Sequence, residues 1–160
     1  SELDSEGLSD LARANTRARL RMATLYAIAG STNGIVIGTG NKVEDFGVGF
    51  FTKYGDGGVD ISPIADLYKS EVYSLGSELG ILPEIMSAPP TDGLWNDGRT
   101  DEEQIGASYK ELEWAMEESE GSALENYSGR EREVMGIFQK LHEQNKHKMS
   151  PIPVFKRVRK

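Results

Sequence analysis

The stretch STNGIVIGTGN, residues 31–41, decides the fold class that the sequence predicts. Its centre, Ile35, Val36 and Ile37, is a continuous apolar run bounded by glycines, which is typical of a strand buried on both faces of a parallel sheet. Residues 8–29, just upstream, have apolar positions at helical spacing and end at Gly30, so they predict a long helix. A helix followed by such a strand is half of a βαβ unit. We therefore expect an α/β fold that the chain enters midway, with a first strand upstream of Ser1.

Helices and two loops follow this stretch. Residues 46–63, FGVGFFTKYGDGGVDISP, contain five glycines and are too aromatic for a solvated linker, so we expect an ordered functional loop. A second loop is predicted at residues 88–100, and helices are predicted at 66–79, after Pro83, at 101–106, at 108–118 and at 129–146. The helix at 66–79 is expected to bury Leu67, Val72, Leu75 and Leu79, and the last helix Val134, Ile137, Phe138 and Leu141.

Composition excludes several classes of protein. The 160 residues fit one domain, and 38% hydrophobic with 28% charged residues is ordinary for a folded protein. A net charge of −8 argues against a broad nucleic-acid surface. The chain has no cysteine, no apolar stretch long enough for a bilayer and no basic, apolar leader at its acidic start. We expect a cytoplasmic protein whose basic clusters, at residues 13–21 and 156–160, leave room for a small anionic ligand.

The first candidate site follows the apolar run. Ligands of open α/β sheets bind beyond the carboxyl ends of the strands, where Thr39, Asn41 and Glu44 lie. Glu44 is a suitable oxygen ligand for a magnesium ion held between phosphates. The alternative is that GTG is a plain turn and that Glu44 is an acidic residue favoured at a helix start.

The second candidate site is spread over the glycine-rich loop and the helix after it. Lys53, Asp56, Asp60 and Lys69 alternate cations with carboxylates around glycines that let a ligand approach closely, which suits a nucleotide. The alternative is a set of surface ion pairs, each contributing under about 1 kcal/mol. We expect this loop to fold back toward Thr39, so that both candidate sites surround one nucleotide pocket.

Other charged groups have simpler explanations. His147 and Lys148 follow a helix and could merely compensate its dipole. Arg17 and Arg21 lie one helical turn apart while Arg19 points elsewhere, as on a solvated helix face. Neither histidine has partners at zinc-like spacing, and no serine nucleophile motif is present.

Several motifs together resemble the ammonia-dependent NAD synthetase family. They are NTRARLRM at 15–22, GTGNKVEDFGVGFFTKYGDGGVDISPIADLYKSEVY at 38–73, PTDGLW at 90–95, GRTDEEQIGASYKELEWAM at 98–116 and HKMSPIP at 147–153. The segment FFTKYGDGGVDISP is highly specific to that family. The resemblance covers most of the chain, from about residue 12 to 153, and also extends to the synthetase domain of glutamine-dependent relatives.

The resemblance implies an ATP-pyrophosphatase fold and a ligase. The fold would be a partial Rossmann-like, adenine nucleotide alpha hydrolase-like parallel sheet with flanking helices. The reaction would adenylate the carboxylate of deamido-NAD with ATP and Mg²⁺, and ammonia, free or released from glutamine, would displace AMP. Roles carry over to residues that match the family's motifs: ATP binding to Thr39, Lys69 and Thr91, the magnesium ligand to Glu44, and deamido-NAD binding to Arg19, Lys53, Asp60, His147 and Lys148. No covalent nucleophile is implied.

The chain departs from the family in one respect. The Ser-Gly-Gly-x-Asp-Ser loop that cradles ATP phosphates is absent from the sequence. We therefore expect residues 1–160 to be the C-terminal part of a synthetase domain and to make no NAD alone. The family also implies a homodimer in which the helix at 8–29 buries an apolar stripe against its symmetry mate. The alternatives are another ATP-pyrophosphatase amidating enzyme with a different acid substrate, and an inactive module that only dimerises.

Overall fold

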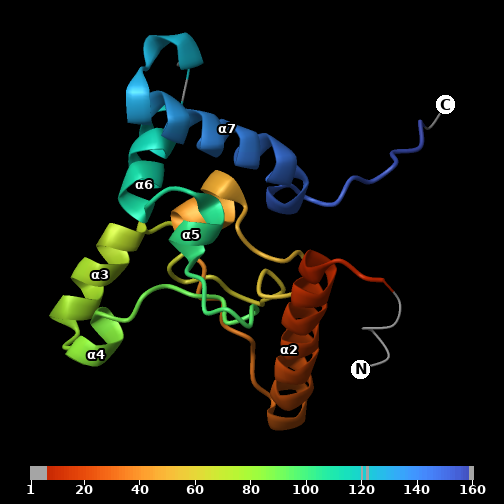
Figure 1. Cartoon of the computed structure of the whole chain (residues 1–160). Coiled ribbons are helices and arrows are strands. Elements are labelled where there is room, and N and C mark those ends of the chain that lie inside the picture. Colours follow the sequence, from red (N-terminus) through yellow and green to blue (C-terminus); the bar gives the residue numbers. More distant parts are fainter. Residues whose placement is uncertain (1–6, 120, 122, 159–160) are drawn as a thin grey trace.

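The computed structural model describes residues 7–119, 121 and 123–158, and within them a central set of loops is surrounded by helices (Figure 1). A long helix, α2 (Asp10–Thr32), stands on one side. On the other side, α6 (Tyr109–Glu118) and α7 (Gly129–Met149) pack over a π-helical turn, η1 (Val43–Val48), and near α5 (Asp101–Ile105). A hairpin of α3 (Lys69–Glu78) and α4 (Pro83–Met86) projects from the body.

Helix α2 forms where the sequence predicts it, but it begins two residues later and ends three residues later, so Gly30 lies inside the helix instead of ending it. The Ser9 hydroxyl accepts a hydrogen bond from the Ala12 amide at its start, and Asn33 ends it in the left-handed conformation, with φ of 53°. Its buried residues are small: Ala14, Ala18 and Ala29. Its large apolar residues lie on the outside, and more than half of the surface of each is exposed: Leu11, Leu20, Leu25 and Ile28.

The predicted strand at residues 35–37 is not formed as expected. Val36 is buried, but Ile35 and Ile37 are 59% and 56% exposed. Ile37 makes an isolated parallel bridge with Ile61, and the described residues contain no longer strand. A strand buried on both faces needs neighbouring strands and a covering layer on each side. Among the described residues, the segment around Ile61 is the only partner of this strand. The parallel direction agrees with the prediction.

The main core lies between α6, α7 and η1. Leu112, Met135, Val43 and Val48 are fully buried in it. Val134 and Phe138 are buried as predicted, while Ile137 and Leu141 are only partly buried against the same cluster. The sequence placed residues 46–48 in a loop, but they complete η1, whose start is capped by Asn41.

Helix α3 corrects another expectation. It begins at Lys69 rather than residue 66 and buries none of its residues. Leu75 and Leu79, two of the residues predicted to be buried, are 43% and 69% exposed. The hairpin packs on itself and on α6, so no layer covers its apolar side.

The remaining predicted elements are present. Helices α5 and α6 begin with capping boxes formed by Thr100 with Glu103 and by Ser108 with Glu111. Residues 88–100 form a loop as predicted, and a short helical turn, η2 (Leu124–Asn126), lies in the connection before α7. None of the described helices is both long and apolar enough to cross a bilayer.

Candidate functional site

A cavity of about 440 Å³ lies between α2, the segment around Val36 and the loop before α5. Four of the residues that the sequence nominated line it: Thr39, Glu44, Lys69 and Thr91. They come from parts of the chain more than fifty residues apart, and the tertiary structure brings them together. This cavity is the candidate nucleotide site.

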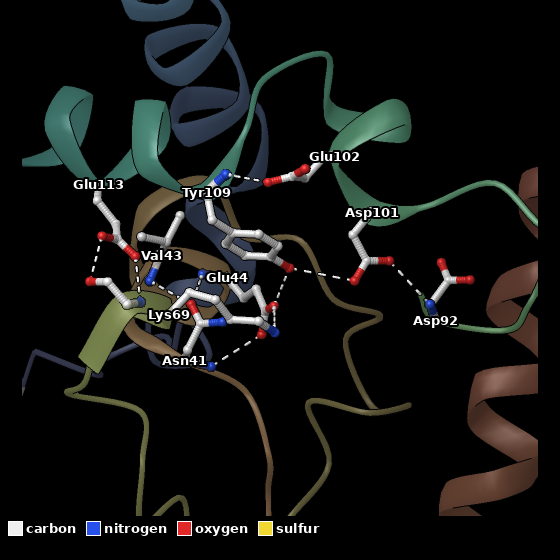
Figure 2. A network of polar contacts seen from close by, with 10 residues as sticks. Asn41, Val43, Glu44, Lys69, Asp92, Asp101, Glu102, Tyr109 and Glu113 are labelled. Atoms are coloured by element: carbon white, nitrogen blue, oxygen red, sulfur yellow. Dashed lines mark hydrogen bonds and ion pairs between the residues drawn. The ribbon is translucent and has the colours of Figure 1, made fainter. Parts of the chain in front are cut away.

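Glu44 is the most strongly held side chain in this cavity (Figure 2). One of its carboxylate oxygens accepts a hydrogen bond from the Asn41 amide at 3.1 Å, and the other accepts one from the Tyr109 hydroxyl. The Lys69 ammonium group lies 3.6 Å from the second oxygen. With side chains 15% and 23% exposed, Glu44 and Lys69 form a largely buried ion pair at the wall of the cavity.

The local sequence explains why Glu44 points this way. The side-chain oxygen of Asn41 accepts hydrogen bonds from the amides of Val43 and Glu44, both at 3.1 Å, and so starts η1. Gly40 lies beside it, and a Cβ atom there would clash with the Asp45 carboxylate unless that side chain moved. The GTGN segment is therefore a close-packed turn and also a wall of the cavity.

Carboxylates give the site a negative electrostatic character. Burial, helped by the charges of Glu44 and Asp56, raises the pKa of Asp45 to about 6. Burial also raises the pKa of Asp101, with further contributions from Asp92 and Glu44, against the lowering effect of Lys69. A polyphosphate in this cavity would therefore need a cation besides Lys69 to offset the repulsion.

The donor set suits magnesium bound mainly through its substrate. Among the described residues, no three His, Cys, Asp or Glu side chains are grouped to hold a metal ion by themselves. Magnesium is usually bound through one or two carboxylates, with water and substrate phosphates as its other ligands. Glu44 fits as such a ligand, since its two oxygens offer about four acceptor positions and not all of them are occupied.

A second cavity, of about 270 Å³, shares Thr39 and Glu44 with the first. Asp56 and Lys148 lie on its wall with several aromatic residues. The Lys148 ammonium group donates to the Phe51 carbonyl at 2.7 Å, and burial lowers its pKa, although the nearby Asp56 opposes that shift. A cation thus reaches the second cavity from α7.

Four of the five residues nominated for deamido-NAD binding line neither cavity. Arg19 donates to the Lys53 carbonyl at 3.3 Å, and the Lys53 ammonium group donates to the His147 carbonyl at 2.7 Å. These three form a connected chain beside the cavities. Asp60 lies elsewhere and accepts hydrogen bonds from the Val36 amide and the Tyr26 hydroxyl.

The expectation of a single pocket is therefore only partly correct. The glycine-rich loop does fold back to the Thr39 edge, through Asp56 and Val59. Lys53 and Asp60, however, use their charged groups to hold backbone atoms of this same chain. Sequence spacing cannot reveal that competition, since the backbone partners are distant in the sequence.

Sequence reasoning also missed contributors to the site. Tyr109 and Asp101 were not nominated for the site, because they fall only at the starts of the helices predicted at 108–118 and 101–106. The two arginines one turn apart on α2 hold the neighbouring loop: Arg17 donates to the Leu94 carbonyl at 2.6 Å, and Arg21 to those of Asp92 and Gly93 at 2.9 Å. For Tyr109, the signal available in the sequence was the Ser108–Glu111 capping box, which fixes this residue in the first turn of α6.

Comparisons with known proteins show which family the chain is similar to. The family model described as NAD synthase matches residues 1–152. The NH(3)-dependent NAD(+) synthetase of Alkaliphilus oremlandii (strain OhILAs) is 44% identical over 153 residues, which is 94% of this chain and 57% of the relative. That of Archaeoglobus fulgidus is 44% identical over 146 residues, or 91% and 56%. The chain thus spans somewhat more than half the length of these relatives.

Two solved structures are similar in fold. The NMN synthetase from Francisella tularensis superposes with a TM-score of 0.79 at 34% identity, over 96% of this chain and 60% of that one. The NH3-dependent NAD synthetase from Campylobacter jejuni, in complex with the nitrate ion, gives a TM-score of 0.68 at 26% identity, over 96% and 59%. The helix-rich arrangement described above is shared with synthetases of this kind, and the chain belongs to the NAD synthase family.

Proposed function

We propose that this chain forms the nucleotide-binding and metal-binding side of a synthetase that uses ATP to convert the carboxylate of deamido-NAD into an amide with ammonia. One observation carries the proposal: Thr39, Glu44, Lys69 and Thr91 surround one cavity of about 440 Å³. The names of the relatives support the reaction. Residues 1–160 would be the C-terminal part of the synthetase domain, which is in keeping with the share of each relative that the chain covers.

The fold proposal follows from the same observations. The parallel bridge between Ile37 and Ile61 would be one rung of a parallel sheet of the adenine nucleotide alpha hydrolase-like type. Exposed Ile35 and Ile37 would then be covered by the part of the domain that the relatives have in addition.

The residues of the cavity would act by binding and charge compensation. The Lys69 ammonium group would face the phosphates, and the hydroxyls of Thr39 and Thr91 could donate hydrogen bonds to phosphate or ribose oxygens. Glu44 would hold Mg²⁺, which when bound neutralises negative charge on phosphate oxygens. With these charges offset, the two anionic substrates can be held in contact.

The chemistry needs no nucleophile from the protein. A carboxylate oxygen of deamido-NAD attacks the α-phosphorus of ATP, so that an acyl adenylate forms and pyrophosphate leaves. Ammonia then attacks the acyl carbon, AMP leaves with the electron pair of the broken bond, and a proton is lost from the new amide.

The deamido-NAD contacts are a further part of the proposal. Lys148 reaches the second cavity, which joins the first at Thr39, so the two substrates could meet there. Arg19, Lys53 and His147 lie beside it and would exchange their present backbone partners for the substrate. Asp60 would act more indirectly, since it fixes Val36.

Assembly as a homodimer in the cytoplasm completes the proposal. The outer face of α2 exposes Leu11, Leu20, Leu25 and Ile28, which gives an apolar stripe suited to an isologous contact. The net charge of −8 is unfavourable for binding the phosphates of a nucleic acid over a broad surface.

Binding of Mg-ATP to the chain tests the proposal. We expect Lys69→Ala to raise the dissociation constant of Mg-ATP at least about tenfold in calorimetry, because a charge-assisted contact to phosphate is lost. Lys42→Ala is the matched control, since Lys42 pairs with Asp66, whose side chain is 97% exposed. Equal affinities for the two variants, both well folded by circular dichroism, or no binding by the unchanged chain, would contradict the nucleotide site.

A second candidate substrate is favoured by the structural comparison. The solved structure with the TM-score of 0.79 is an NMN synthetase, so the acid substrate could be the mononucleotide of nicotinic acid rather than deamido-NAD. Binding of the two acids to the chain, measured side by side with ATP present, separates these candidates. If the chain binds neither acid and no ATP but still dimerises, the inactive dimerising module is the correct alternative.

A further inference from the structure

Tyr109 occupies a special position between the candidate metal ligand and the candidate ATP lysine (Figure 2). It is the first residue of α6 and only 5% exposed. Its hydroxyl donates to Glu44, and its ring lies under the Lys69 ammonium group, 4.7 Å from ring centroid to nitrogen. One side chain therefore contacts both members of the buried ion pair.

The surroundings hold Tyr109 firmly in place. Its amide donates to a Glu102 carboxylate oxygen at 2.8 Å, and the capping box of Ser108 and Glu111 fixes the turn around it. One turn further along α6, Leu112 is completely buried in the main core. The hydroxyl is thus presented from a rigid element, whereas Glu44 and Lys69 come from a turn and a projecting hairpin.

Glu44 is held from two opposite directions. The Asn41 amide fixes one carboxylate oxygen and the Tyr109 hydroxyl fixes the other, so the carboxylate has little freedom to rotate. Without the hydroxyl, Lys69 at 3.6 Å would be the remaining partner on that oxygen, and the existing ion pair would tighten. A cation would then have to compete with Lys69 for the carboxylate.

Tyr109 also connects Glu44 to the loop that carries Thr91. Its hydroxyl lies 3.4 Å from a carboxylate oxygen of Asp101, whose other oxygen accepts from the Asp92 amide at 3.1 Å. Asp92 directly follows Thr91. Because the hydroxyl has a single proton, it can donate to only one carboxylate at a time, and its shorter contact is with Glu44. With Asp101 as its second neighbour, the hydroxyl lies at the centre of one polar network.

We propose that Tyr109 is a positioning residue that limits how closely Lys69 approaches Glu44 and orients the Glu44 carboxylate for a divalent cation. It acts through its hydroxyl on Glu44 and through its ring on Lys69, and it touches neither substrate nor metal itself. This inference rests on the proposed function of Glu44. Hydrogen-bonded partners of metal ligands commonly change metal affinity about 10-fold to 100-fold when they are removed.

The test uses Mn²⁺ alone as the probe and Tyr109→Phe, which keeps the ring. Paramagnetic broadening of the amide resonances of residues 40–45 reports ion binding at Glu44. We expect Tyr109→Phe to raise the midpoint Mn²⁺ concentration roughly tenfold, Glu44→Gln to abolish the broadening, and the double variant to match Glu44→Gln. Tyr127→Phe is the control, since that ring packs edge-on against Trp114 and neither ring lines one of the two cavities. A midpoint for Tyr109→Phe within twofold of the unchanged chain overturns the inference.

A second measurement separates this inference from the proposed function. Urea unfolding of the unchanged chain, Tyr109→Phe, Glu44→Gln and the double variant gives the coupling between the two side chains. We expect the effects of the single changes on the unfolding equilibrium constant to be non-additive by roughly tenfold. Coupling below twofold overturns the positioning role whatever the metal does. Should Glu44→Gln leave the Mn²⁺ broadening intact while the coupling is strong, the metal site is wrong and the Tyr109 to Glu44 contact stands. The ¹³Cζ resonance of Tyr109 should also shift in Glu44→Gln, which tests the contact without changing Tyr109.

Discussion

Two regions of the molecule carry similar amphipathic helices but treat them differently. Around η1, α6 and α7 the apolar side chains are buried in one core. In α2 and in the hairpin of α3 and α4 the large apolar residues are exposed, Leu20 by 61%, Leu79 by 69% and Ile85 by 62%. The difference teaches that apolar residues at helical spacing identify a helix face that can be buried. Whether that face is buried depends on the elements that pack beside it.

The nucleotide site lies on the border between these regions. Glu44 belongs to the packed region through η1, whereas Lys69 belongs to the exposed hairpin. Ligand binding and the stability of the hairpin should therefore be linked, since Lys69 would be ordered in the bound state.

The largest contrast is expected from a matched pair of leucine truncations. Leu112→Ala should lower the free energy of unfolding by about 2–5 kcal/mol, because Leu112 is completely buried and a cavity remains. Leu79→Ala should change it by less than about 0.5 kcal/mol, because that side chain is mostly solvated. Urea unfolding of both variants makes the comparison. Equal losses would show that the hairpin is covered in solution, by a second copy for example.

Hydrogen exchange should sharpen the same contrast without substitutions. Amides of α7, anchored by fully buried Met135, should exchange only through opening of the core. Amides of α3, which has no buried residue, should exchange through local opening, at least about a hundredfold faster. Exchange measured by mass spectrometry on peptides from both helices reports the ratio. A ratio near one would mean that the two regions unfold as one unit.

The raised pKa of Asp45 provides a test of the electrostatics where the packed and exposed regions meet. Its pKa of about 6 in the folded protein exceeds the ordinary value near 4, so the folded state binds the proton more tightly than the unfolded state. Stability is then lost as pH rises from about 4 to above 6, and Asp45→Asn should restore about 1–2 kcal/mol at pH 7.5 but almost nothing at pH 4. Urea unfolding at the two pH values measures this, with Asp66→Asn as the exposed control. A gain that is the same at both pH values would contradict the assignment.

The smallest expected effect concerns the loop that α2 holds. Arg21→Ala removes two hydrogen bonds to the Asp92 and Gly93 carbonyls and should cost about 1 kcal/mol of stability. It should also make Trp95 more accessible to acrylamide quenching, measured in a Trp114→Phe background. Arg132→Ala, an exposed position on α7, should leave the quenching unchanged. If Arg21→Ala does too, the loop is held by Leu94 packing instead.

Much of the local structure could be predicted from the sequence. Helix α2, the loop at residues 88–100 and helices α5 to α7 were expected because helical spacing and turn residues are local signals. The stop predicted at Gly30 was wrong, since α2 continues to Thr32. The buried strand at residues 35–37 and the buried face of residues 66–79 were wrong, since burial depends on distant elements. Thr39, Glu44 and Lys69 were nominated from their chemistry and position in the sequence, and Thr91 came only from the resemblance. Tertiary contacts decided that all four line one cavity.

The sequence by itself determined which segments form helices and turns, the acidic balance and the family motifs, because these depend on neighbours along the chain. The tertiary structure alone decided that Tyr109 joins Glu44 to Lys69, that Asp60 and Lys53 hold backbone atoms, and that α2 fixes the loop after Thr91. The physical reason is that hydrogen bonds and burial between residues far apart in sequence are selected by packing, and no local pattern encodes which partner a charged group finds.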